Sequence, residues 1–178
     1  MTKKYHYIAT GHTTPLHDTN PQIVRVDRKA LRRAENEEFL KNSNVQAFLS
    51  MIAKSEGGDY HAKYGNGWKP GNWTFTDEST HPGYGWNKAS TASGRYQILE
   101  GSWKEHGIKK QGLTDFSPHT QDLIAVEIIR FRHAVDDVVD GDIQAAIDKL
   151  KANEWVSLPK HSFSTLKDWF TEAGGKVK

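Results

Sequence analysis

The chain has no cysteine, which excludes a disulfide framework and a thiol nucleophile and leaves its stability to packing. It also lacks an excess of charge of either sign, because 24 Lys and Arg stand against 22 Asp and Glu for a net charge of +2. That balance does not indicate a nucleic-acid partner. No apolar run has the length of a signal peptide or a membrane span, so we expect no stable membrane insertion.

The 178 residues that are present suffice for one domain with a real core. Apolar residues recur at helical spacing along most of the chain. Residues 57–92 differ, because their Gly, Asn, Pro and aromatic residues indicate short strands joined by tight turns. We therefore predict an α+β fold that is mostly helical, with a small β lobe at about residues 57–92 beside a cleft.

Glu56 is the strongest candidate for chemistry. The residues before it place apolar side chains on one helix face, namely Val45, Phe48, Leu49, Ile52 and Ala53. Glu56, eleven residues after Val45, falls on the same face. A carboxyl at the edge of an apolar interior has a raised pKa and can stay protonated near neutral pH, as a general acid must. The structural alternative is a solvated helix end before Gly57-Gly58.

The aromatic residues of the predicted lobe suit either sugar rings or a protein core. For four of them, we expect at least two to be core residues: Trp68, Trp73, Tyr84 and Trp86. The chain then enters a helix that Ser93 or Thr91 can cap, with Tyr96, Leu99 and Trp103 on its buried face.

The residue pattern of the C-terminal half predicts helices that form the structural scaffold and carry no evident chemistry. Ser117-Pro118 is an N-cap followed by Pro at the first helical position, and the segment it opens directs four residues inward: Leu123, Ile128, Phe131 and Val135. Two more helices are predicted at residues 142–151 and 164–173. The acidic group Asp136, Asp137, Asp140 and Asp142 lacks the ligand alternation of a calcium loop and indicates a solvated turn.

Residues 1–43 carry no motif with a clear role, although residues 27–41 indicate a charged helix. His12, His17 and Asp18 are metal ligands by type but lack the spacing of a zinc site. A packing arm, a tail that binds the target surface and a partner-docking segment all remain open.

Short motifs along the rest of the chain occur in a fixed order. They are Ser55-Glu56-Gly57, Phe75-Thr76-Asp77 with His81-Pro82, Ser93-Gly94-Arg95-Tyr96-Gln97, Asp115-Phe116-Ser117-Pro118 with Gln121-Asp122, residues 141–148, and Trp155-Val156-Ser157-Leu158-Pro159. Over about residues 46–175 the chain resembles the lambda-type phage lysozymes, which are endolysins.

The resemblance implies that residues 44–178 form a lysozyme-like catalytic domain and that residues 1–43 are an extension. It implies a lytic transglycosylase, which cuts the β-1,4 bond from N-acetylmuramic acid to N-acetylglucosamine in peptidoglycan, leaves a 1,6-anhydro end and consumes no water. Glu56 would then be acid and base in turn, without metal or cofactor. Six residues are expected to bind the glycan: Gln97, Tyr96, Thr91, Trp73, Trp86 and His81.

Three alternatives remain open. A hydrolytic muramidase would add a second carboxylate from Asp59, Asp77 or Glu78. A wall-binding protein would keep the groove and lose turnover. An antibacterial effector would be exported by a specialised machine, whereas an endolysin accumulates in the cytoplasm as a monomer and reaches the periplasmic wall through a partner's pore.

The chain departs from the family at two places beside the expected cleft. It is shorter between Pro82 and Ser90, and Lys160-His161-Ser162-Phe163 replaces a longer Gly-rich stretch after Pro159. In the family these segments form lips over the glycan. We therefore expect a more open groove that binds short oligosaccharides weakly.

Overall fold

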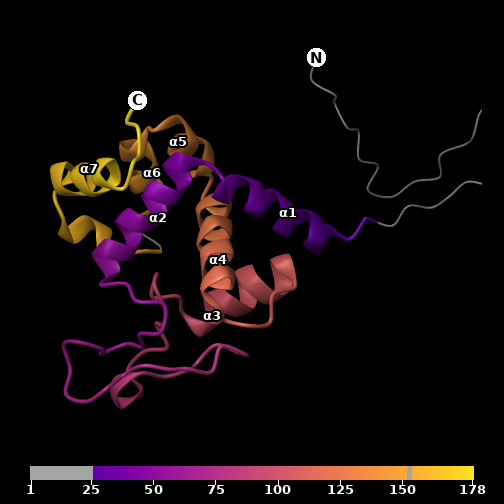
Figure 1. The fold of residues 1–178 in the computed structure, drawn as a ribbon, viewed down its shortest axis with the longest axis vertical. Coiled ribbons are helices and arrows are strands. Elements are labelled where there is room, and N and C mark those ends of the chain that lie inside the picture. The colour runs from indigo at the N-terminus through magenta and orange to yellow at the C-terminus, as the bar shows by residue number, and fades with distance from the viewer. Residues whose placement is uncertain (1–25, 152–153) are drawn as a thin grey trace, which may run out of the picture.

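Helices account for most of the architecture in the computed structural model, which describes residues 26–151 and 154–178 (Figure 1). In chain order they are α1 (Arg28–Leu40), α2 (Ser43–Glu56), the 3₁₀ turn η1 (Trp86–Lys88), α3 (Glu100–Ser102), the π-helical segment η2 (Trp103–Lys109), α4 (Pro118–Phe131), α5 (Val135–Asp140), α6 (Ile143–Leu150), the 3₁₀ turn η3 (Leu158–Lys160) and α7 (Phe163–Glu172). The helices predicted at residues 27–41, 142–151 and 164–173 are confirmed within two residues at each end.

Helix α2 is the element that carries the candidate acid. Its first turn is capped by the side chain of Asn42, which accepts the backbone N–H groups of Asn44 and Val45 at 2.9 and 3.2 Å. Gly57 ends the helix in the left-handed conformation (φ 72°) that glycine adopts without strain. The apolar face of α2 packs on α7, where the rings of Phe48 and Phe170 meet edge to face with centroids 6.5 Å apart.

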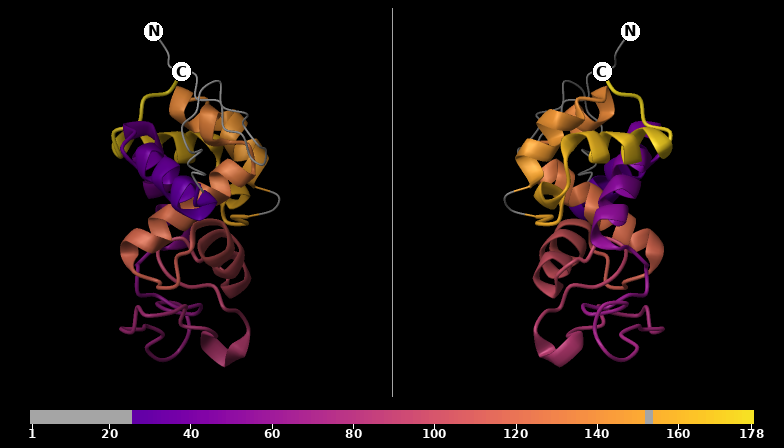
Figure 2. Two further views of the ribbon diagram at one scale, coloured as in Figure 1. Left: turned by 90° about the vertical axis from the view of Figure 1, so that its right-hand side faces the viewer. Right: turned by 90° about the vertical axis from the view of Figure 1, so that its left-hand side faces the viewer.

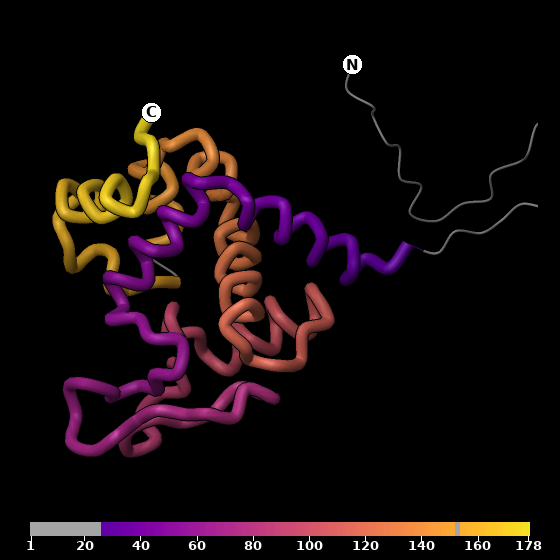
Figure 3. Tube along the Cα trace, viewed as in Figure 1, coloured from indigo at the N-terminus to yellow at the C-terminus, as the bar shows by residue number. Residues whose placement is uncertain are grey.

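Helix α4 is largely buried and lies beside α2 (Figures 1 and 3). The predicted start is confirmed, since Ser117 Oγ accepts the N–H of Thr120 and Pro118 follows at the first helical position. The inward assignment of Phe131 was wrong, because this residue is 45% exposed. The helix ends at Phe131, and the chain turns at His133 with a positive φ of 56°, so the helical spacing no longer holds there.

Helix α1 lies against α4 and belongs to the same helical body (Figure 3). Arg32 donates to both carboxylate oxygens of Glu127, at 2.7 and 3.0 Å, and Glu127 is fully buried. Asn36, also fully buried, donates to Glu127 and accepts from Arg130. Hydrogen bonds of this kind compensate the burial of a carboxylate. The metal candidates His12, His17 and Asp18 lie outside the described residues.

The lobe at residues 57–98 lies at one end of the helical body, below α2 and α4 in Figure 1 and in both views of Figure 2. The predicted β lobe is not confirmed: the described residues form no strand, only three isolated antiparallel bridges, Ala62 with Thr74, Lys63 with Ser93 and Ser93 with Ile98. Three closely spaced glycines with positive φ, Gly65, Gly67 and Gly71, turn the chain too often for a ladder to extend.

The four lobe aromatics do not form a core, contrary to our expectation. Trp68 and Tyr84 are 58% and 56% exposed, and Trp73 and Trp86 are only partly buried. Lys69 lies over two of these rings, with Nζ 4.7 Å from the centroid of Trp68 and 4.2 Å from that of Trp86. These four rings therefore face solvent at least in part, and backbone hydrogen bonds hold much of the lobe.

Candidate active site

Glu56 is the last residue of α2, at the junction between the helical body and the lobe. Its neighbours on the apolar face, Ile52 and Ala53, are buried, whereas Gly57 is exposed. The carboxyl is accordingly partly buried, with the protein interior on one side and solvent on the other. This is the environment that its position on the helix face predicts.

Desolvation raises the pKa of the Glu56 carboxyl above its ordinary value of 4.5. A hydrogen bond from Ser157, whose hydroxyl donates to Oε1, and the nearby charges of Lys160 and His161 act in the opposite direction but do not cancel the burial. All three of these residues lie on the turn between α6 and α7. The carboxyl can therefore hold a proton at a higher pH than a solvated glutamate.

The three carboxylates considered as second partners are engaged elsewhere. Asp59 accepts the backbone N–H of His61 at 2.7 Å, and Glu78 pairs with Nε2 of the same histidine at 2.7 Å. Asp77 accepts the N–H of Ser79 at 2.9 Å, and hydrogen bonds from Ser79 lower the pKa of Asp77. None of the three forms a hydrogen bond with Glu56 in the described part of the chain.

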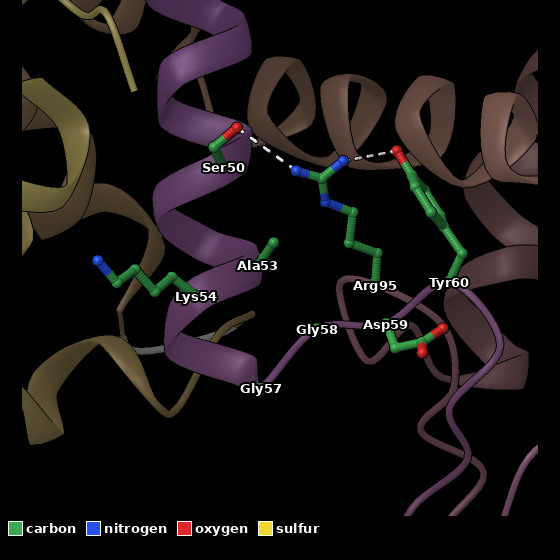
Figure 4. Close-up of a pocket in the computed structure, with 8 residues that line it drawn as sticks. All are labelled: Ser50, Ala53, Lys54, Gly57, Gly58, Asp59, Tyr60 and Arg95. Atoms are coloured by element: carbon green, nitrogen blue, oxygen red, sulfur yellow. Dashed lines mark hydrogen bonds between the residues drawn. The ribbon is translucent and has the colours of Figure 1, made fainter. Parts of the chain in front are cut away.

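A cavity of about 580 Å³ opens beside the end of α2 and is not lined by Glu56 itself (Figure 4). Its residues are Ser50, Ala53, Lys54, Gly57, Gly58, Asp59, Tyr60 and Arg95. Arg95 reaches across it, donating to Tyr60 at 2.8 Å and to Ser50 at 3.4 Å. Arg95 therefore joins the lobe to α2.

Two of the six predicted glycan-binding residues are buried. Tyr96 is 1% exposed and donates its hydroxyl proton to Asp122 at 2.6 Å. His81 is 6% exposed, and both ring nitrogens are engaged, Nε2 with the Ile98 carbonyl at 3.0 Å and Nδ1 with the Gly83 N–H at 3.1 Å. Burial lowers the pKa of His81, which agrees with a neutral ring. Both residues support the lobe and have no polar atom left for a sugar.

The other four predicted residues keep partly exposed side chains: Gln97, Thr91, Trp73 and Trp86. Gln97 stands out because its φ of 48° lies in the left-handed region, which non-glycine residues seldom adopt outside special sites. Its Nε2 donates to the Gly94 carbonyl at 3.0 Å, which fixes the direction of the amide.

The segment after Gln97 differs from the predicted helix. Tyr96 and Trp103 are buried as expected, but Leu99 is 49% exposed because the helix begins only at Glu100. Neither Thr91 nor Ser93 is the N-cap, which is Leu99 without a side-chain cap. Thr91 reaches the helix start from nine residues away, since its Oγ1 accepts the N–H of Glu100 at 3.1 Å.

Ser157 is the site residue that sequence reasoning missed. It lies 101 residues from Glu56, in a motif in which Trp155 and Leu158 are buried and Val156 and Pro159 are exposed. No local spacing joins Ser157 to α2. The only signal in the sequence is a polar residue in an otherwise apolar and turn-forming motif.

Comparison with known proteins agrees with this geometry. The sequence model of the Endolysin family matches residues 46–177. The chain is 38% identical over 152 residues to the endolysin of Escherichia phage lambda, covering 77% of this chain and 95% of that protein. It is 39% identical over 158 residues to the endolysin of Escherichia phage P2, covering 75% and 94% respectively.

Solved structures of phage lambda lysozyme share the fold. One, in complex with a chitohexasaccharide, matches with a TM-score of 0.68 at 37% identity, over 77% of this chain and 97% of that chain. A second matches with a TM-score of 0.65 at 33% identity. The fold and these relatives thus define a lysozyme-like enzyme that degrades the cell wall. The chain belongs to the endolysin family, as its motifs predicted. Helix α1 lies ahead of the segment that the family shares.

Across the described residues, no helix combines the length and apolarity needed to cross a bilayer.

Proposed function

We propose that the chain is a lytic transglycosylase acting on peptidoglycan, with Glu56 as its only acid and base. The observation that carries the proposal is a single partly buried carboxyl with a raised pKa, whose strongest charged neighbours are Lys160 and His161 rather than a second carboxylate. An ordinary glycosidase needs two carboxyl groups that cooperate across the scissile bond. A transglycosylase needs only one.

The reaction proceeds in two proton transfers at Glu56. The protonated carboxyl donates to the glycosidic oxygen as the bond from C1 of N-acetylmuramic acid breaks. The C6 hydroxyl of the same sugar then attacks C1, and the Glu56 carboxylate accepts the hydroxyl proton. The new C1–O6 bond closes the 1,6-anhydro ring, the enzyme regains its proton, and no water is used.

The substrate is a glycan strand that reaches Glu56 from the lobe side. The solved relative in complex with a chitohexasaccharide, 37% identical to this chain, supports a binding site for β-1,4-linked N-acetyl sugars. Gln97 and Thr91 supply polar contacts, and the partly exposed rings of Trp73 and Trp86 supply faces for sugar stacking. Tyr96 and His81 hold these residues in place from beneath.

The biological setting we propose is host-cell lysis. The enzyme accumulates in the cytoplasm as a monomer and reaches the periplasmic wall through a pore made by a partner protein. This part of the proposal is supported by the family alone.

Mass spectrometry of the fragments released from purified peptidoglycan tests the chemistry. We expect muropeptides one water lighter than the reducing species, and loss of release by at least about 100-fold in Glu56→Gln. Glu78→Gln, a carboxylate of the lobe, is the matched control and should retain activity. Reducing ends would instead establish a hydrolase with a second carboxylate. An active Glu56→Gln variant would refute the assignment of Glu56.

A further inference from the structure

Ser157 holds one oxygen of the candidate acid. Its hydroxyl donates to Oε1 of Glu56, and Ser157 itself is 7% exposed. On its other side, Ser157 Oγ lies 2.9 Å from Oγ of Ser55, the residue that precedes Glu56 on α2. Three oxygen atoms from two distant parts of the chain therefore form a short row that ends at the carboxyl.

The hydroxyl protons limit the arrangement of this row. A serine hydroxyl has one proton to donate and can accept through its lone pairs. The Ser55 proton goes to the Ile52 carbonyl at 2.8 Å, so Ser55 can only accept in its contact with Ser157. The Ser157 proton goes to Oε1 of Glu56, and it would have to turn to Ser55 if Oε1 carried a proton.

The turn that carries Ser157 is fixed in place. Its backbone closes on itself through bonds from Leu158 N to Trp155 O at 3.1 Å and from Lys160 N to Ser157 O at 2.9 Å. Trp155 is 4% exposed and donates its indole N–H to the Tyr96 carbonyl at 2.9 Å, and Leu158 is fully buried. Ser157 thus has little freedom to follow a carboxyl that moves.

The two oxygens of Glu56 are consequently unlike. Oε1 accepts the proton of the Ser157 hydroxyl, whereas no side chain of the described residues donates to Oε2. A proton on Oε2 leaves the Ser157 bond intact before and after its transfer. A proton on Oε1 would require Ser157 to reverse its hydroxyl. A prearranged donor that needs no reorientation during the reaction is favoured for catalysis.

We propose that Ser157 is a positioning residue that keeps Oε1 as an acceptor and so assigns the transferable proton to Oε2. The inference rests on the proposed role of Glu56 as acid and base. Ser157 does not touch the substrate; it sets the orientation of the carboxyl and stabilises the carboxylate that exists between the two proton transfers.

The expected pH effect follows from the groups around the carboxyl. Ser157, Lys160 and His161 all favour the ionised form of Glu56. The charges of Lys54 and Glu172, on α2 and α7, pair with each other at 3.0 Å. The hydrogen bond from Ser157 lowers the pKa of Glu56, and burial raises it. Removing the Ser157 hydroxyl therefore lets the pKa of Glu56 rise further. Because the reaction starts from the protonated carboxyl, the alkaline limb of the pH–rate profile moves to higher pH.

The test compares Ser157→Ala, Ser157→Thr and Ser164→Ala by their rates of muropeptide release from purified peptidoglycan across pH. We expect Ser157→Ala to lower kcat about tenfold, to change KM less than about twofold, and to move the alkaline limb upward. Ser157→Thr, which restores a hydroxyl, should recover most of kcat and return the limb toward that of the parent. Ser164 is an exposed serine on α7 and is the matched control, so its variant should behave as the parent.

Thermal unfolding of each variant shows whether a lower rate of muropeptide release is caused by unfolding of the protein. A folded Ser157→Ala protein with the parent's kcat and pH profile overturns the positioning role. If Glu56→Gln is inactive at the same time, the proposed function stands without it. An active Glu56→Gln variant removes both proposals together.

Discussion

The helical body and the lobe at residues 57–98 are held together by different physics. In the body, α2, α4, α6 and α7 bury a continuous apolar core that includes fully buried Phe48, Ile124, Leu150 and Phe170. In the lobe, Trp68, Trp73, Tyr84 and Trp86 are exposed or half-exposed, and isolated bridges and backbone hydrogen bonds hold most of the chain. We therefore expect the body to be the more rigid part and the lobe to offer side chains that are open to solvent.

Glu56 lies where these two regions meet, a position that suits its proposed role as acid and base. The body supplies burial, which raises its pKa, and a fixed partner in Ser157. The lobe supplies polar and aromatic side chains that are not needed for packing. In the proposed reaction, the orientation of the acid and an accessible binding surface would thus come from separate parts of one domain.

The largest effect is expected in the body. Phe170→Ala removes a fully buried ring that meets Phe48 edge to face, so we expect a loss of about 3–5 kcal/mol in the free energy of unfolding. Urea denaturation of both proteins measures it. A cost below about 1 kcal/mol would mean that the α2–α7 contact collapses to fill the space, and that the body is less rigid than its packing indicates.

An intermediate effect, opposite in sign, is expected where the regions meet. Because burial raises the folded-state pKa of Glu56, its protonated form contributes stability that is complete below the unfolded value of 4.5 and is lost as pH rises through the folded-state pKa. Gln cannot ionise. Glu56→Gln should therefore gain about 1 kcal/mol, or about 2–4 °C in Tm, near pH 8 and nothing near pH 3.5.

Differential scanning calorimetry of both proteins at the two pH values measures the gain. Glu172→Gln is the control, since its exposed pair with Lys54 contributes little at either pH. An equal gain at both pH values would show that the stabilisation does not come from the charge of Glu56.

The smallest effect is expected in the lobe. Trp68 is 58% exposed and its ring touches mainly Tyr64 and Lys69, so Trp68→Ala should change the free energy of unfolding by about 0.5 kcal/mol or less. The same urea series as for Phe170→Ala measures it. A loss above about 2 kcal/mol would reveal a core in the lobe and remove the contrast between the two regions.

The sequence was a good guide wherever one local rule controlled the outcome. The spacing of apolar residues around Phe48 and Ile52 predicted α2 and placed Glu56 on its buried face, and Ser117-Pro118 predicted the start of α4. The rule failed at helix ends: Leu99 precedes α3, Phe131 is the last residue of α4, and both are exposed. Periodicity predicts a face only while the helix lasts.

The lobe was the least predictable region. Gly, Pro and aromatic residues predicted the tight turns correctly, but they did not predict the absence of strands in the described residues. Whether isolated bridges extend into strands depends on which distant backbone groups pair. Aromatic type alone also failed to separate buried Tyr96 from exposed Trp68.

The sequence by itself determined the longer helices, the position of Glu56 at the end of α2 and, through its ordered motifs, the endolysin family, because each of these depends on residue types at short spacing. Only the tertiary structure decided the partners. It placed Ser157 on Glu56 across 101 residues, Arg32 on Glu127 across 95, and His81 beneath the lobe rather than on its surface. These contacts depend on how the helices pack against each other, and packing brings together side chains that no local pattern relates.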